Sequence, residues 1–427
     1  MSNSAIRNRI EARINQGEFL SSMLHLVGGS ADDAQEDFVT KLSGIASAVR
    51  DLLDKNELVR RVEYKPSEYW PSLRGKAISF VDGGVASIDL PSAAPIGIRV
   101  GSYTVRPGDE SEERETFNIE LSLVDDLFGG NLYDGNIPDI AKLRDAARIV
   151  SELAAVLSLA KAEKGRPDGI VLHGPLVNPA APYGLEDFPA FSIDTCRGFL
   201  GEPDWVGDAG ERNFVSFYKL LLERVRATGV PVVGAVERSI GQDPVFVRNV
   251  LRKLVQESEL KPKDAQAIEQ SIHNYGLNDA ALLGVVLDEG EYVAPIPIDR
   301  QGPPNKWPET WKYQIGTYPE ALTSYIKPNS MAAPFRVESF AGESQMGSML
   351  ELIFNTSRLL PTYGFPVGLD IVDKFAKVPA WLSKSVKGQH QVVLLKKALE
   401  SGDVRTIAFA KRVLAAKGRD WLFRPTA

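Results

Sequence analysis

Residues 77–84 read Ala-Ile-Ser-Phe-Val-Asp-Gly-Gly, an apolar run that ends on one carboxylate and two glycines. A short apolar run bounded by turn-forming residues is typical of a buried β-strand. Gly83 and Gly84 tolerate backbone angles that other residues resist, and they leave the space beside Asp82 open. An acid at the mouth of a core strand suits a hard divalent cation. The alternative is that Asp82 opens a tight hairpin turn, because Asp-Gly is a strong turn signal.

Residues 169–176, Gly-Ile-Val-Leu-His-Gly-Pro-Leu, repeat this design with a histidine in place of the acid. The apolar run predicts a second buried strand, and His173 stands at its end, followed by Gly174. His173 is therefore expected to occupy a place equivalent to that of Asp82. The alternative for this lone histidine is a side chain satisfied within a turn.

The rest of the chain supplies the order of elements that defines a fold. The elements expected after the Asp82 strand are, in chain order, strand segments at 96–100, 103–105 and 117–123, a helix over 139–164, the His173 strand, a helix over 214–228 and a strand over 230–236. Alternating apolar and polar residues in 117–123 indicate an antiparallel strand with one wet face. Antiparallel strands followed by helix, strand, helix and strand are the order of the ribonuclease H-like fold, an α/β architecture with a mixed sheet whose first three strands are antiparallel.

Helical extensions are predicted on both sides of this core. Residues 1–75 are expected to form the N-terminal extension, because isoleucines recur every four residues from Ile6 to Ile14. The core domain is expected over 76–380, and a basic helical tail over 381–427.

Within the core, the region over 244–280 reads as helical and charged, with Arg248, Arg252 and Lys253 on successive turns. These cations are interpreted as a solvated helix face, and the alternative is a guide for a phosphate backbone. Apolar residues over 282–298, interrupted by Asp-Glu-Gly, predict a β-hairpin.

The composition is that of an ordinary globular protein in a reducing compartment. The chain has 427 residues and a formal net charge of −7, so binding to nucleic acid would need a local basic surface or a partner. The single cysteine, Cys196, excludes a disulfide framework and a cysteine-rich zinc site. A signal peptide and a run of membrane-spanning length are both absent from the sequence, so a cytoplasmic protein without membrane contact is expected.

The expected fold predicts where a metal site would lie. In the ribonuclease H-like architecture, acids on the first strand, the first helix, the fourth strand and a late helix converge on one or two divalent metals. The residues at these four places are Asp82, Glu152, His173 and Asp373. Two neighbouring metals can activate a water and stabilise the leaving oxygen in phosphodiester cleavage. The sequence therefore predicts a phosphodiester-cleaving site.

Two of these residues also have a simpler explanation. Arg148 and Glu152 are four residues apart, and the alternative for them is a surface salt bridge worth a few tenths of a kcal/mol. Asp370 and Asp373 can share a helix face, and the alternative for them is a pair of acids that favours a helix start.

These motifs resemble those of the NurA nucleases over roughly residues 76–380. Residues 77–84 are similar to that family's first motif, an apolar strand ending in Asp-Gly-Ser, and Glu152 is similar to its helix glutamate. Residues 170–176 look like its second strand motif, whose polar residue is usually Asp. Residues 364–373 are similar to its late motif of Gly-Tyr-Pro, Leu and His.

Three residues depart from the family pattern. His173 replaces the strand aspartate, Asp373 replaces the late histidine, and Phe365 replaces the late tyrosine, with Tyr363 two residues away. If His173 and Asp373 face the same metal, the two exchanges still supply one histidine and one aspartate. Manganese would suit this mixed nitrogen and oxygen set better than magnesium. The alternative is a decayed site.

The resemblance implies a metal-dependent DNA nuclease, of 5′–3′ exonuclease or endonuclease type, that works as a homodimer with a HerA-type hexameric ATPase in DNA end processing or anti-phage defence. The chain has no Gly-x-x-x-x-Gly-Lys-Ser/Thr loop, so the motor is expected to be a separate protein. The alternative is a catalytically decayed adaptor dimer that caps and regulates that motor. A sugar or acetate kinase relative would need phosphate-cradling glycines after two strands, and Gly83, Gly84 and Gly174 match that need only weakly.

Overall fold

The computed structural model describes residues 42–87, 96–124, 137–177, 214–237, 244–298, 315–360 and 362–412, together with residues 8 and 313. The predicted isoleucine stripe from Ile6 to Ile14 lies outside the described residues, and so does the last part of the predicted tail. All statements about the structure below refer to the described residues.

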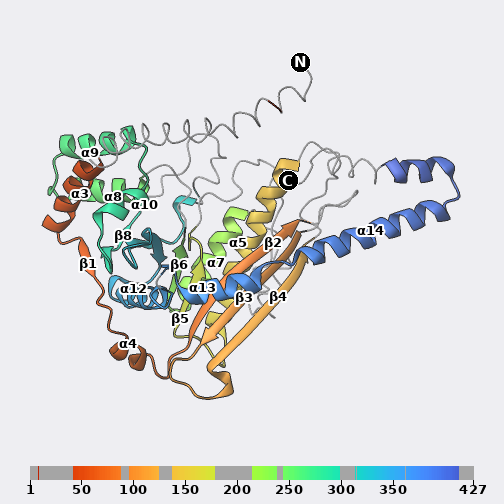
Figure 1. Ribbon diagram of the computed structural model, residues 1–427, viewed down its shortest axis with the longest axis horizontal. Coiled ribbons are helices and arrows are strands. Elements are labelled where there is room, and N and C mark those ends of the chain that lie inside the picture. Colours follow the sequence, from red (N-terminus) through yellow and green to blue (C-terminus); the bar gives the residue numbers. More distant parts are fainter. Residues whose placement is uncertain are drawn as a thin grey trace.

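A ten-stranded mixed sheet runs through the molecule (Figure 1). Its path is β1-β7-β9-β10-β6-β5-β2-β3-β4, and β8 pairs with β9 off this path. The strands are β1 (Val59–Arg61), β2 (Ile78–Ser87), β3 (Ile96–Val105), β4 (Glu115–Val124), β5 (Gly169–His173), β6 (Val232–Val236), β7 (Glu291–Val293), β8 (Ile296–Pro297), β9 (Leu322–Ile326) and β10 (Phe335–Ser339).

The part of this sheet from β4 to β6 has the strand order and directions of the ribonuclease H-like fold. Strand β3 is antiparallel to both β2 and β4, while β5 is parallel to β2 and β6 is parallel to β5. The predicted fold class is therefore confirmed. The two predicted strand segments at 96–100 and 103–105 form one continuous strand, β3, paired along its full length with β2.

Helices cover both faces of the sheet. They are α3 (Ser43–Lys55), α4 (Pro66–Ser72), α5 (Ile137–Lys161), α7 (Phe214–Ala227), α8 (Val245–Gln256), α9 (Pro262–Asn274), α10 (Asp279–Val286), α12 (Glu343–Ser357), α13 (Val367–Ala376) and α14 (Ala380–Glu400), with a short 3₁₀ helix at Glu112–Arg114. Successive residues of a strand point to opposite faces. Accordingly, Val81 packs in the core with α5 and α7, whereas Phe80 packs in the core with α12 and α13.

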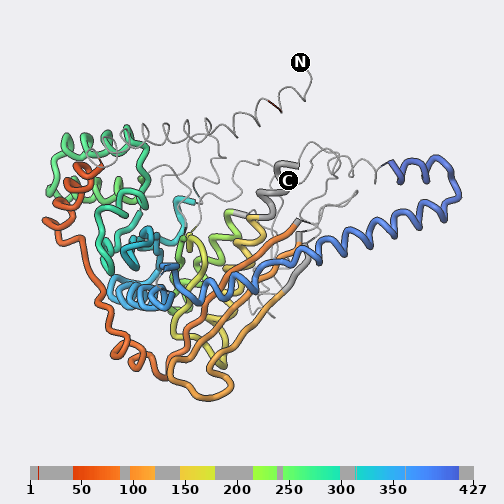
Figure 2. The backbone as a smooth tube through the Cα atoms, viewed as in Figure 1, coloured from red at the N-terminus to blue at the C-terminus, as the bar shows by residue number. Residues whose placement is uncertain are grey.

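Two helical regions lie outside these layers. Helix α3 packs with α8, α9 and α10 in a third apolar cluster at the β1 end of the sheet. Helix α14 extends away from the body as a long rod (Figure 2). Several large apolar side chains on and beyond this helix are exposed, among them Trp381, Val392 and Phe409.

The predicted hairpin at 282–298 is wrong in its first half. Residues 279–286 form helix α10, which begins after Asn278, whose side chain accepts a hydrogen bond from the backbone N–H of Ala281 at 2.8 Å. Leu282, Leu283 and Val286 are buried, a spacing that places them on one face of a helix. Strand β1 was not predicted, because three residues are too few to show a periodicity.

Glu291, at the start of β7, ties the N-terminal part of the chain to the sheet. Its carboxylate accepts hydrogen bonds from Arg50 of α3 at 2.5 and 3.2 Å, from Arg61 of β1 at 3.0 Å and from the backbone N–H of Asp288 at 2.8 Å. Burial alone would raise the pKa of Glu291, but these donors outweigh it and lower the pKa to about 2. A carboxylate with a depressed pKa stabilises the fold above its unfolded-state pKa.

We expect Glu291→Gln to lower the free energy of unfolding at pH 7 by about 2–3 kcal/mol. The deficit relative to wild type should shrink as the pH falls from about 4 towards 2, because wild-type Glu291 then becomes protonated too. Urea unfolding at several pH values measures this.

The matched control is Glu343→Gln, which breaks the 2.6 Å ion pair of Glu343 with Arg60 of β1, where both side chains are about half exposed. An exposed pair contributes at most about 1 kcal/mol. Equal losses in the two variants would contradict the anchoring role of Glu291.

Candidate functional site

Asp82, in the middle of β2, and His173, the last residue of β5, lie side by side on neighbouring strands. The predictions that the strand ends at Asp82, or that Asp82 opens a tight hairpin turn, are wrong, because β2 continues through both glycines to Ser87 in its pairing with β3. Val81 of β2 and Leu172 of β5 are paired in register, so the next residues, Asp82 and His173, are level with one another. The Nδ1 atom of His173 lies 3.1 Å from Oδ2 of Asp82. The parallel pairing of β2 with β5 thus brings together two predicted site residues that are far apart in the sequence.

Glu152 reaches this position from helix α5, on the opposite face of the sheet from α13. A Cβ atom added to Gly83 would lie only 2.6 Å from both Cγ and Oε1 of Glu152. The absence of a side chain at Gly83 therefore lets the Glu152 carboxylate come up against the backbone next to Asp82. The structure brings Glu152 into the same cluster as Asp82 and His173.

Gly84 likewise lets α13 approach β2 closely from the other face. A Cβ atom at Gly84 would collide with the carbonyl oxygen of Ala376 and lie 3.0 Å from Cα of Lys377. In the neighbouring strand, a Cβ atom at Gly101 would lie 3.0 Å from Val372. Glycines on β2 and β3 thus allow α5 and α13 to approach these strands from opposite faces.

Two buried carboxylates lie close together in this cluster. Asp82 and Glu152 are 5% and 4% exposed. Burial raises the pKa of Glu152, and the negative charge of Asp82 raises it further, while Arg148 opposes both effects with Nη1 at 2.6 Å from Oε1. The net result is a raised pKa for Glu152. The predicted alternative of a surface salt bridge is wrong for this pair, because Glu152 is buried.

His173 carries charge-stabilising contacts on both ring nitrogens. Burial lowers the pKa of His173, but the hydrogen bond and charge of Asp82, with Glu152 and Glu237, outweigh it and raise the pKa. Oε2 of Glu237 lies 4.0 Å from Nε2 of the ring. The Phe365 ring packs against the imidazole at a centroid distance of 5.5 Å.

Glu237 was not predicted as a site residue. It directly follows the buried strand β6, just as Asp82 and His173 stand at the ends of apolar runs. An ionisable side chain at the end of an apolar run was therefore the signal that could have identified it.

Asp373 has a different partner. Its carboxylate lies 2.5 Å from Nζ of Lys377, one turn further along α13 and just past its end, and Asp370 pairs in the same way with Lys374 at 2.6 Å. In the described part of the chain, no three His, Cys, Asp or Glu side chains are grouped closely enough to hold a metal ion. The cluster consists of Asp82, Glu152 and His173, and Asp373 is engaged by Lys377.

The cluster nevertheless suits a divalent cation in its chemistry. Two buried carboxylates beside one another, with the charge of one raising the pKa of the other, favour any added positive charge. Carboxylate oxygens and an imidazole nitrogen are a donor set that manganese accepts. Asp82, Glu152 and His173 therefore match such an ion in donor type and burial, while as they stand their side chains are not grouped closely enough to hold one.

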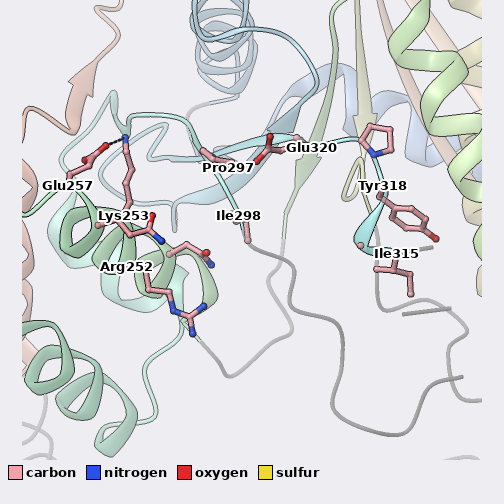
Figure 3. A pocket seen from close by; sticks show the side chains of 13 residues that line it. Arg252, Lys253, Glu257, Pro297, Ile298, Ile315, Tyr318 and Glu320 are labelled. Atoms are coloured by element: carbon pink, nitrogen blue, oxygen red, sulfur yellow. Dashed lines mark ion pairs between the residues drawn. The ribbon is translucent and has the colours of Figure 1, made fainter. Parts of the chain in front are cut away.

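A pocket of about 710 Å³ lies elsewhere, along helix α8 and the loops around β8 and β9 (Figure 3). Its lining includes Arg252, Lys253, Tyr318 and Glu320, and none of the lining residues belongs to the Asp82 cluster. Lys253 pairs with Glu257 at 3.8 Å within α8, and both side chains are more than one third exposed. This pair favours the interpretation of Lys253 as part of a solvated helix face.

Residues 76–378 match the family model of the NurA domain. Among solved structures, the NurA nuclease from Sulfolobus solfataricus is similar with 14% identity and a TM-score of 0.49, over 93% of this chain and 98% of that one. A NurA bound to dAMP and manganese is similar with 13% identity and a TM-score of 0.36, over 86% and 94%. No curated protein sequence matches the chain. None of the described helices is long and apolar enough to cross a membrane.

We expect Gly83→Ala to lower the free energy of unfolding by roughly 1–3 kcal/mol, because the added methyl group would displace the buried Glu152 carboxylate. Urea unfolding measures this loss. Gly97→Ala is the matched control on the neighbouring strand, where a Cβ atom would meet only the carbonyl oxygen of Ala86, at 3.7 Å. If the two variants were equally stable, the close approach of Glu152 to β2 would be refuted.

Proposed function

The chain belongs to the NurA domain family, and from this premise we propose that it is a divalent-metal-dependent DNA nuclease. The observation that carries the proposal is that Asp82 in the middle of β2, His173 at the end of β5 and Glu152 of α5 lie near one another. Like-charged carboxylates in a buried position are stable only with a compensating cation.

We propose Asp82, Glu152 and His173 as the residues that hold the metal, with Asp373 as a fourth donor. Manganese, or magnesium, is the proposed ion, because the set mixes oxygen and nitrogen donors. A bound ion would supply an activated water and stabilise the leaving oxygen of a phosphodiester. Two NurA structures were determined with manganese.

The protein's own residues prepare the site for such a charge. Arg148 binds one oxygen of Glu152, and the Asp82 carboxylate has one oxygen facing His173 and the other accepting the backbone N–H of Gly83 at 2.8 Å. These contacts fix both carboxylates in place. The His173 side chain is about one quarter exposed, so the cluster opens to solvent on that side. A phosphodiester would approach from there.

We further propose that the nuclease, of 5′–3′ exonuclease or endonuclease type, works as a homodimer with a HerA-type hexameric ATPase, in DNA end processing or anti-phage defence. The family membership supports a nuclease acting on DNA. The net charge of −7 and the absence of a phosphate-binding loop from the sequence favour DNA delivery by a separate motor.

A second candidate is a non-catalytic adaptor that caps and regulates the motor. One observation favours it: the carboxylate of Asp373, the residue in place of the family's late histidine, is paired with Lys377. In this case the buried carboxylates would be neutralised by Arg148 and His173 alone.

We expect the purified protein, with its motor partner, to cut linear DNA in manganese, and Asp82→Asn to lower the cleavage rate by at least roughly 100-fold, since a carboxylate proposed to hold the metal is lost. Gel assays of labelled DNA measure the rate. Asp370→Asn is the control, because it removes a carboxylate of α13 that pairs with Lys374, and it should leave the rate within about twofold.

Cleavage by Asp82→Asn at the wild-type rate would contradict the nuclease proposal for this site. Absence of cleavage by wild type, with retained stimulation of the motor's ATPase, would establish the adaptor in its place.

A further inference from the structure

A row of aromatic rings crosses three strands next to Asp82. Phe80 of β2, Tyr103 of β3 and Phe117 of β4 are paired in register. The ring centroids of Phe80 and Tyr103 are 6.1 Å apart, those of Tyr103 and Phe117 are 4.7 Å apart, and both pairs are stacked. Because residues two apart in a strand share a face of the sheet, this row lies on the same face as Asp82, about 7 Å along the strand.

The row ends at the surface in two exposed phenyl rings. Helix α13 lies across β2 and β3 (Figure 1), and its Phe375 contacts the Phe117 ring at a centroid distance of 5.2 Å. Phe80 and Tyr103 are buried, whereas Phe117 is 49% and Phe375 42% exposed. Ile119, two residues along β4, is exposed as well. The Phe117–Phe375 pair is thus an apolar platform that the buried rings behind it hold in place.

Two cations lie on the other side of Asp82 from this platform. Arg99 of β3 is paired in register with Gly84, two residues beyond Asp82. Nη1 of Arg99 donates to the backbone carbonyl oxygen of Lys377 at 3.3 Å, and a Cβ atom at Gly84 would lie 3.0 Å from Cα of Lys377. The hydrogen bond and charge of Asp373 raise the pKa of Lys377, and the charge of Asp82 adds to this effect. Lys377 is therefore within electrostatic reach of Asp82.

The charges around the platform decide on which side a phosphate is favoured. Glu115 precedes Phe117 by two residues on β4, and its charge acts on the Tyr103 hydroxyl, so negative charge lies beyond the aromatic row. On the opposite side, the Lys377 side chain is 69% exposed in its pair with Asp373. An exposed ion pair contributes little to stability, so a phosphate can replace that carboxylate.

We propose that Phe117 and Phe375 bind an unpaired base of a DNA strand by stacking, while Lys377 and Arg99 bind a phosphate further along the same strand, which thereby passes Asp82. The proposal takes DNA as the ligand from the proposed function. Every base has a π-face, so stacking on phenyl rings accepts any sequence. A base within a duplex already stacks on its neighbours, so the platform selects a single-stranded end.

A protein partner is the other class of molecule that could cover this surface. Strand β4 is the last strand on the path of the sheet, and an unpaired edge can receive a strand from another chain. The observations favour DNA, because the exposed rings continue into the rows that carry Asp82 and the two cations.

Fluorescence anisotropy of a labelled oligothymidylate of roughly 12 nucleotides, with the full-length protein in EDTA, tests the stacking role. We expect Phe375→Leu to weaken binding roughly 5- to 100-fold, because leucine keeps the apolar contact but has no ring. Phe375→Trp should bind at least as tightly as wild type. The control is Phe409→Leu, which removes a ring that is 68% exposed beyond α14 and should stay within about twofold of wild type.

An abasic oligonucleotide of the same length separates the base from the phosphates. Wild type and Phe375→Leu should bind it equally, because it has nothing to stack. Lys377→Gln should lower the slope of log affinity against log salt concentration by about 0.7, the value of one lost phosphate contact on a single strand.

Lys374→Gln is the matched control for Lys377. Lys374 is on the same helix and is 66% exposed. It is two residues from both Val372 and Ala376, which face the strands, so it points away from them. Its substitution should leave the slope unchanged.

Each contrary result overturns a stated part of the proposal. Absence of oligothymidylate binding by wild type, equal affinity of wild type and Phe375→Leu, or an equal loss on the abasic strand would overturn the stacking role. Equal slopes for Lys377→Gln and Lys374→Gln would overturn the phosphate contact. A changed oligomeric state of Phe375→Leu in light scattering, with wild-type oligonucleotide affinity, would assign the platform to a contact between copies of the chain.

The proposed function can fail separately from this inference. Binding is measured in EDTA and without a motor, so it requires neither a metal ion nor cleavage. If Asp82→Asn cleaves DNA at the wild-type rate, the nuclease site is elsewhere, and the anisotropy results still decide whether the platform binds a single strand.

Discussion

The structure depends on two buried carboxylates whose charges interact, Asp82 in the middle of β2 and Glu152 on α5. Such a pair is unfavourable without positive charge, because burial and mutual repulsion both raise the pKa. The two glycines after Asp82 make the placement possible, since they let α5 approach from one face of the sheet and α13 from the other. Negative charge is thus concentrated in a buried position beside the middle of β2.

Side chains from different elements compensate this negative charge. Arg148 on α5 binds Glu152, His173 on β5 contacts Asp82, and Lys377 at the end of α13 holds Asp373. A divalent ion would replace part of this compensation and draw the donors together. The same contacts serve the adaptor alternative, in which protein cations alone neutralise the acids.

The sequence predicted the parts of the site that follow from local patterns. Asp82 and His173 follow short, mainly apolar runs, and the order of the elements was sufficient to place them on neighbouring parallel strands. Asp373 was expected in the cluster from the late helix of the expected fold and from the family resemblance, and its pair with Lys377 follows the i,i+4 spacing that the sequence itself contains. Glu237 was missed because only the strand over 230–236 was predicted, and the residue that follows this strand was not assigned a role. The region 279–286 was misread because a short apolar run fits a strand and a helix equally.

The central claim is that Asp82, Glu152 and His173 bind one divalent cation. An anomalous difference map from a crystal grown with manganese tests it most directly. The account predicts a peak within about 2.0–2.3 Å of donor atoms of Asp82 and His173, with Glu152 turned from Arg148 towards it. A fully occupied manganese peak elsewhere, or an empty cluster with the Arg148–Glu152 contact intact at saturating manganese, would contradict it.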